Sequence, residues 1–278
     1  MATVDLPAGK VYYRETGPAD GPVVLFVHGF LVDDTLWGDV PERLGRRGFR
    51  CLAPTWPLGA HRAAMLPGAD LSPRGVARVV ASFLETLDLH DVVLVGNDTG
   101  GAVCQLLLDE EPSRVGRLVL TNCDAFDTFP PFPFNVLFRL ARNATVGRGL
   151  LQLTRIGWVR TSPLGFGLLT RRRLTAEETR PWVAPYLADA DVRRDVAAFA
   201  RAWTGRELSG SALWLRQFER PVLVVWGRRD RLFKPSMARR LVATLPQARL
   251  VEVEDATTFV SLDQPARLAD EIAGFASG

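Results

Sequence analysis

Small residues crowd around Asp98 in the segment Leu94-Val95-Gly96-Asn97-Asp98-Thr99-Gly100-Gly101-Ala102. An apolar run leads into this segment and a helical pattern follows it, which predicts a strand, a tight turn and a helix in direct succession. The three glycines would let strand and helix pass closely and hold the aspartate on a strained turn. This pattern indicates a catalytic carboxylate; the alternative is an aspartate that only caps the helix.

Continuous apolar runs rich in valine and leucine alternate with amphipathic segments along most of the chain. Such runs are typical of strands buried on both faces of a parallel sheet. We expect strands at 11–14, 23–28, 50–53, 92–97, 117–122, 221–226 and 249–253, and helices at 36–45, 73–87, 101–110, 236–245 and 264–275. The pattern predicts an α/β fold, with a mostly parallel sheet flanked by helices.

Residues 128–218 interrupt this alternation, because they contain no convincing strand. The region opens with a cluster of proline and phenylalanine and continues as helical pieces with four tryptophans. It is too long for a plain loop, so we expect a helical cap over the carboxyl ends of the strands, where open α/β sheets bind ligands. The core would then comprise residues 1–127 and 219–278.

Composition narrows the classes of partner. The chain has 278 residues and a net charge of +3, and 32 of its 34 basic residues are arginines scattered among acids, so we expect no nucleic-acid partner. No apolar run is long enough for a membrane span, and the N-terminus lacks a signal-peptide pattern. We therefore expect a cytoplasmic protein without a membrane partner that could form a homodimer. Three cysteines without CxxC spacing, and no phosphate-binding loop, predict neither a metal nor a cofactor.

Three further segments, Phe26-Val27-His28-Gly29-Phe30, Val224-Val225-Trp226-Gly227-Arg228-Arg229-Asp230 and residues 254–265, together with the Asp98 turn, resemble the α/β-hydrolase superfamily. Within it they are similar to the haloalkane dehalogenase and epoxide hydrolase branch, which uses an aspartate nucleophile. The resemblance implies an α/β-hydrolase fold with a helical cap. It also implies that Asp98 is the nucleophile, that the amides of Phe30 and Thr99 form an oxyanion hole, and that Asp230 is the triad acid.

The chain departs from that branch at several positions. Thr258 occupies the place of the histidine that activates water, and a threonine hydroxyl cannot take a proton near neutral pH. Thr99 and Phe30 replace the tryptophan and asparagine with which dehalogenases hold halide. The expected cap offers Tyr186 where epoxide hydrolases use two tyrosines.

His61 and Asp124 are the candidates to replace the missing base, because both follow strands at the edge where Asp98 lies. Several acids around one pocket could also raise one another's pKa and leave one of them protonated. His90 is expected at the opposite edge of the sheet. The residues expected to line a site for an apolar organic substrate are His28, Trp56, Phe129, Tyr186, Thr258 and Phe259, with His28 pinning its loop rather than serving as a base.

Three functions remain open at this point. The first is a hydrolase that acts on an ester, an epoxide or a carbon–halogen bond with a non-standard base. The second is a cyclase, lyase or isomerase in which Asp98 works as a general acid or base, which the absent histidine and the aromatic insertion favour. The third is a ligand-binding protein without catalytic activity.

Overall fold

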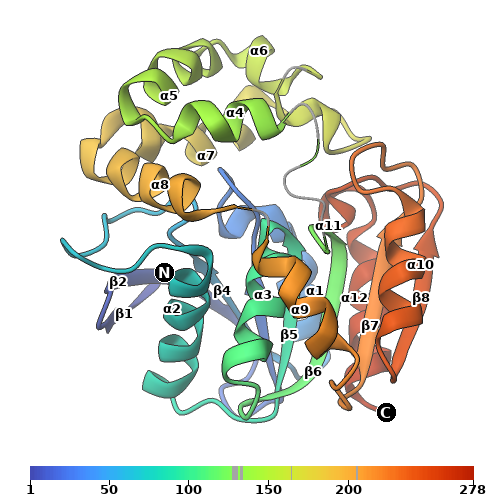
Figure 1. The fold of residues 1–278 in the computed structure, drawn as a ribbon. Helices are drawn as coiled ribbons and strands as arrows, with labels where there is room; N and C mark the ends of the chain where they lie inside the picture. The colour runs from blue at the N-terminus through green and yellow to red at the C-terminus, as the bar shows by residue number, and fades with distance from the viewer. Residues whose placement is uncertain (127–130, 132–133, 164, 205) are drawn as a thin grey trace.

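An eight-stranded sheet forms the centre of the protein in a computed structural model that describes residues 1–126, 131, 134–163, 165–204 and 206–278 (Figure 1). The strand order is β1-β2-β4-β3-β5-β6-β7-β8. β2 pairs antiparallel with β1 and β4, and all other neighbours are parallel. The strands are β1 Ala2–Leu6, β2 Gly9–Thr16, β3 Val23–Val27, β4 Arg50–Thr55, β5 Val92–Asp98, β6 Val115–Cys123, β7 Val222–Gly227 and β8 Ala248–Val253.

Both faces of the central strands are buried, which explains their continuous apolar sequences. In β3, Leu25 and Val27 pack into the apolar cluster on one face, while Val24 and Phe26 pack into a separate cluster on the other. β5 follows the same alternation. Side chains that point alternately to opposite faces require helices on each side of the sheet. The expected α/β fold with a mostly parallel sheet is confirmed.

Helices cover the two faces in separate groups. On one side, α2 (Pro73–Thr86), α3 (Thr99–Glu110) and α10 (Pro235–Thr244) contribute to the first cluster. On the other side, α1 (Val40–Gly45) and α12 (Pro265–Ala276) contribute to the second and contact each other. Within the described chain, none of the helices has the length and apolar character needed to cross a membrane.

All regular secondary structure in the described part of the region between β6 and β7 is helical. It contains α4 (Phe134–Ala141), α5 (Ala144–Leu151), a 3-10 helix η2 (Gln152–Arg155), α6 (Gly157–Thr161), a 3-10 helix η3 (Phe166–Leu168), α7 (Ala176–Ala188), α8 (Ala190–Ala202) and α9 (Glu207–Leu215). Figure 1 shows α4 to α8 as a layer at one end of the sheet, whereas α9 lies beside α3. We refer to α4 through α8 as the helical insertion.

Two local features differ from the sequence expectations. β1 was not expected; it is an edge strand with alternating exposure, so it lacks the continuous apolar run of the central strands. The helix expected at 36–45 is divided into a 3-10 helix η1 (Asp34–Trp37) and α1. Gly38 separates the two at a positive φ of 54°, which a helix cannot contain.

Candidate functional site

Asp98 occupies a strained turn between β5 and α3. Its φ is 53° and its ψ is −130°, a conformation that is costly for a residue with a side chain. A Cβ on Gly100 would lie 2.0 Å from the carbonyl oxygen of Val27, and one on Gly101 would lie 2.3 Å from the Cβ of Cys123. Helix α3 can therefore start against β3 and β6 only because these residues are glycine. The predicted strand, tight turn and helix around Asp98 are present.

The carboxyl group of Asp98 lies against the loop that follows β3. The backbone N–H of Phe30 donates to its Oδ2 over 3.2 Å, and a Cβ on Gly29 would lie 2.2 Å from that oxygen. The backbone amide of Thr99 also lowers the pKa of this carboxyl group. The two amides expected to form an oxyanion hole thus both act on Asp98 itself. Asp98 keeps a partly exposed surface, so a small molecule could reach it.

Burial gives Asp98 an unusual protonation equilibrium. It raises the pKa of Asp98 to about 7, the charge of Asp230 adds to the rise, and the Thr99 and Phe30 amides offset part of it. Near neutral pH the acid and the carboxylate are both well populated. A group with this pKa can both donate and accept a proton.

Asp124 is a second carboxyl group next to Asp98. It directly follows β6, whose Cys123 pairs in register with Asp98, and its backbone N–H donates to the Asp98 carbonyl over 3.4 Å. Asp124 is fully buried, and neither of its carboxyl oxygens has a hydrogen-bond partner of normal geometry among the described residues. Burial, and then the charge of Asp98, raise its pKa well above the usual range, with the Thr99 hydroxyl acting in the opposite direction. Burial without a compensating hydrogen bond therefore favours the protonated form of Asp124.

Asp230 and Thr258 form a separate, fully hydrogen-bonded pair. The Thr258 hydroxyl donates to Oδ2 of Asp230 over 2.9 Å, and Asn122 donates to the same oxygen over 2.7 Å. Oδ1 accepts from the backbone N–H groups of Leu232 and Phe233. Four donors thus satisfy this carboxylate, although burial still raises its pKa. Asn122 was not identified from the sequence, because its position in an apolar strand resembles an ordinary core position.

Thr258→Val tests how much the hydrogen bond between Thr258 and Asp230 stabilises the fold, because valine keeps the volume of the side chain and removes the hydroxyl. Hydrogen bonds to charged groups contribute about 1.5–3 kcal/mol. We expect the free energy of unfolding to fall by about that amount in urea titrations, whereas Thr258→Ser should retain most of it. Equal stability of the valine variant and the native chain would contradict the pairing.

The histidines lie in structural contacts. His28 is fully buried, its Nδ1 donates to the Gly29 carbonyl over 2.9 Å, and its Nε2 accepts from the Trp56 amide over 2.8 Å. Burial lowers the pKa of His28 to about 4, so the ring is neutral. These contacts fit a residue that pins its loop. His90 is exposed and makes a hydrogen bond with the carboxyl group of Asp88.

His61 connects the core to the helical insertion. Its Nε2 lies 3.2 Å from Oδ2 of Asp195 in α8, and its Nδ1 accepts from the Gly59 amide over 3.3 Å. Asp195 also accepts the Met65 amide over 2.7 Å. Both ring nitrogens are engaged, so the described contacts leave His61 no free nitrogen for water. Asp195 was not identified from the sequence, because its partner is 134 positions away.

The other residues expected at the site divide between the core and the insertion. Trp56 is fully buried and donates its indole N–H to the Phe26 carbonyl over 3.0 Å. Tyr186 is fully buried in α7, and its hydroxyl has no hydrogen-bond partner among the described residues. Phe259 is buried and packs edge-on against a tryptophan of the insertion. Phe129 lies outside the described residues.

Aromatic rings from the helical insertion pack against Phe30, whose backbone N–H binds Asp98. The ring of Phe30 lies 4.7 Å from that of Phe138 in α4 and 6.1 Å from that of Phe199 in α8. These two residues were not expected at the site, since aromatics at helical spacing resemble core residues. The insertion therefore places apolar side chains beside the carboxyl ends of β3 and β5. Among the described residues, no cluster of potential ligands could hold a metal ion.

Comparisons with known proteins identify the family to which the fold belongs. Residues 22–265 match the family described as the alpha/beta hydrolase fold. The chain is 29% identical over 284 residues to haloalkane dehalogenase 2 of Mycobacterium tuberculosis, covering 96% of this chain and 92% of that protein. It is 27% identical over 287 residues to the cis-3-alkyl-4-alkyloxetan-2-one decarboxylase of Xanthomonas campestris, covering 97% and 93%. A haloalkane dehalogenase structure from Bradyrhizobium elkani superposes with a TM-score of 0.82 at 20% identity over 100% of this chain and 97% of its own, a likeness of fold alone.

Proposed function

The chain belongs to the α/β-hydrolase fold family, and we propose that within it this protein is an enzyme that converts an apolar organic substrate without consuming water. Asp98 would serve as the general acid and base. The observation that carries this proposal is the pair of adjacent carboxyl groups, Asp98 and Asp124, both with raised pKa values and neither with a histidine partner in the described contacts. A carboxyl group that is easily protonated in an apolar site suits proton transfer.

Hydrolysis is less well supported by the contacts. In an aspartate-nucleophile hydrolase, a histidine that is hydrogen-bonded to the triad acid must activate the water that cleaves the ester intermediate. Here the hydroxyl of Thr258 donates to Asp230 in place of that histidine, and both ring nitrogens of His61 make other hydrogen bonds. We therefore assign His61 to holding the insertion against the core.

The first substrates to test are oxetan-2-ones with two alkyl substituents, the class named for the Xanthomonas relative. Such a lactone is apolar, which suits the rings of Phe30, Phe138 and Phe199. Protonated Asp98 would donate to the ring oxygen as the bond from that oxygen to the alkyl-bearing carbon breaks, which leaves this carbon electron-deficient and a carboxylic acid on its neighbour. The bond between that neighbour and the carboxyl carbon would then break, its electron pair would form the carbon–carbon double bond, and the acid proton would return to Asp98 as CO2 leaves. The products would be an alkene and CO2, and no water would be used.

A product assay with a cis-dialkyl oxetan-2-one tests this reaction. We expect gas chromatography and mass spectrometry to detect the alkene with the native chain and not with Asp98→Asn. Asp124→Asn keeps the shape of the buried side chain and should lower turnover by about tenfold or more. Formation of the hydroxy acid with oxygen-18 from labelled water would instead establish a hydrolase.

A second candidate is covalent attack by Asp98, which its position on a strained, accessible turn favours. Alkyl halides, epoxides and activated esters would then leave a stable adduct, because no histidine contacts Asp98 or Asp230 among the described residues to activate water for its hydrolysis. Intact-protein mass spectrometry distinguishes the two readings. An adduct on the native chain that is absent from Asp98→Asn would support the nucleophile and contradict pure proton transfer.

A further inference from the structure

The helical insertion carries an unusual distribution of charge. Residues 128–176 contain eight arginines and no aspartate or glutamate, whereas the rest of the chain holds 26 basic residues and all 31 acidic ones. The overall charge of +3 therefore combines a strongly basic segment with a net acidic remainder. Arg139, Arg148 and Arg155 are exposed and make no ion pair within the described part of the chain. Positive charge concentrated in this way attracts an anionic surface.

Exposed apolar side chains concentrate on the same segment. Of the eight large hydrophobic residues exposed among the described residues, six lie between positions 136 and 158. We call them the outer apolar group: Val136, Val146, Leu150, Leu153, Ile156 and Trp158. Trp158 is the most exposed, at 71%. Val146 and Leu150 share one face of α5, and Figure 1 shows α5 and α6 on the side of the insertion away from the sheet.

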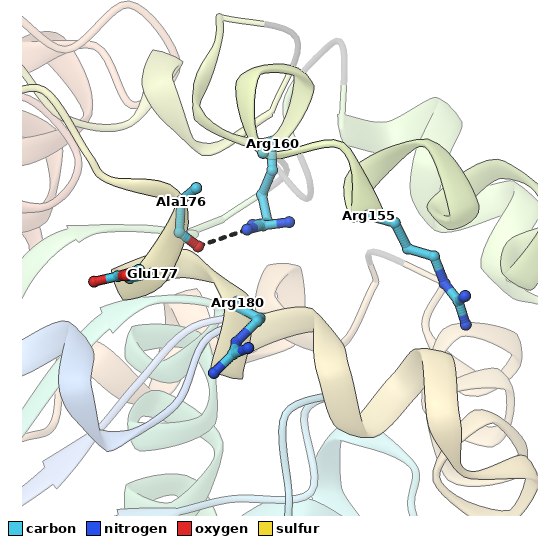
Figure 2. Close-up of a pocket in the computed structure, with 6 residues that line it drawn as sticks. Arg155, Arg160, Ala176, Glu177 and Arg180 are labelled. Carbon is cyan, nitrogen blue, oxygen red and sulfur yellow. Dashed lines mark hydrogen bonds between the residues drawn. The ribbon is translucent and has the colours of Figure 1, made fainter.

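A basic hollow lies next to Trp158. It has a volume of about 370 Å³ and is lined by Arg155, Gly157, Arg160, Ala176, Glu177 and Arg180. Figure 2 shows the side chains of Arg160 and Arg180 on one side, the guanidinium group of Arg155 extending away from both, and the Glu177 carboxylate pointing in the opposite direction to Arg155. Arg160 is buried and fixed by hydrogen bonds to Thr179 and to the Ala176 carbonyl. Such a hollow could accept a phosphate oxygen, because guanidinium groups bind phosphate well.

We propose that this face of the insertion docks on an anionic lipid bilayer, with the outer apolar group entering the interface and the arginines binding lipid phosphates. A tryptophan beside arginines is typical of side chains at the membrane–water boundary. A second copy of the chain fits less well, because a symmetric contact would bring two basic segments together. The sequence expectation of no membrane partner rested on the lack of an apolar run long enough to span a bilayer, and docking on the bilayer surface needs no such run.

Sedimentation with lipid vesicles tests the proposal on the full chain. We expect binding to vesicles of equimolar phosphatidylcholine and phosphatidylglycerol, weaker binding at high salt, and little binding to phosphatidylcholine alone. Arg155→Glu and Trp158→Ala should each weaken binding by roughly tenfold. Both side chains are exposed, so the fold should not change.

Matched controls are available on the core. Arg46→Glu and Leu66→Ala alter an exposed arginine and an exposed leucine outside the insertion, and should leave binding unchanged. Equal binding to both kinds of vesicle, absence of binding to either, or equal loss in the controls would overturn the proposal. A dimer in light scattering that Trp158→Ala dissociates would also overturn it, in favour of a second copy. None of these results depends on the reaction at Asp98.

Discussion

Replacing Asp98 by asparagine is expected to lower turnover by about two to four orders of magnitude while stabilising the fold above neutral pH. Asparagine keeps the shape and an oxygen that can accept the Phe30 amide, but it cannot exchange a proton. Activity of the native enzyme should fall as pH rises above about 7, where Asp98 loses the proton that it donates. Any residual activity of the asparagine variant should not fall in this way as pH rises.

The gain in stability follows from the pKa of the same group. Burial raises the pKa of Asp98 from an ordinary value of 3.8 to about 7, so the folded chain binds more protons than the unfolded chain between these values. The free energy of unfolding must therefore fall as pH rises through that window. With each unit equal to about 1.4 kcal/mol, the loss at pH 8 is on the order of 2–4 kcal/mol. Asp98→Asn removes this pH-dependent loss of stability, because asparagine does not ionise.

Urea titrations at pH 5 and pH 8 measure this effect. The asparagine variant should exceed the native chain in stability at pH 8 and approach it at pH 5. Asp230→Asn is the matched control, because its carboxylate accepts four hydrogen bonds and the amide would face the Asn122 donor. That control should lose stability. A stability gain for Asp98→Asn that does not depend on pH would contradict a raised pKa.

Gly100→Ala is expected to destabilise the protein by about 3 kcal/mol or more, a large effect for one methyl group. The new Cβ would lie 2.0 Å from the Val27 carbonyl oxygen and 2.5 Å from that of His28, and neither backbone atom can move without disturbing β3. The Phe30 amide would shift with the loop, so the site should be damaged together with the fold. Thermal and urea unfolding measure the loss.

Gly274→Ala provides the contrasting case. Gly274 lies in α12, and its added Cβ would meet nothing within 4 Å. Alanine should stabilise this helix by about 0.5–1 kcal/mol. The same substitution in two helices should thus have opposite signs. Equal effects at both positions would show that the close approach at Gly100 does not constrain the turn.

The sequence indicated the Asp98 turn because its physical cause is local. Strand, turn and helix follow one another within nine residues, and the glycines that permit close packing are part of the segment itself. The central strands were predictable for a similar reason, since burial on both faces leaves a continuous apolar run. β1 was missed because an edge strand buries only one face.

The chemistry of the site depended on contacts between distant residues. His61 is a candidate base by its position along the chain, and its contact with Asp195, 134 positions away, is visible only in the folded protein. Asp124 became significant because parallel pairing of β5 and β6 places it beside Asp98, while its carboxyl oxygens have no hydrogen-bond partner of normal geometry among the described residues. No pattern within a single element encodes such pairs.

The sequence by itself determined the α/β architecture and the central position of Asp98, because both follow from apolar periodicity and from glycines close along the chain. Only the tertiary structure decided the raised pKa values of Asp98 and Asp124, the hydrogen bonds of His61, and the packing of Phe138 and Phe199 against Phe30. Burial and electrostatic interaction depend on which distant groups come together in the folded chain, and those properties set the chemistry.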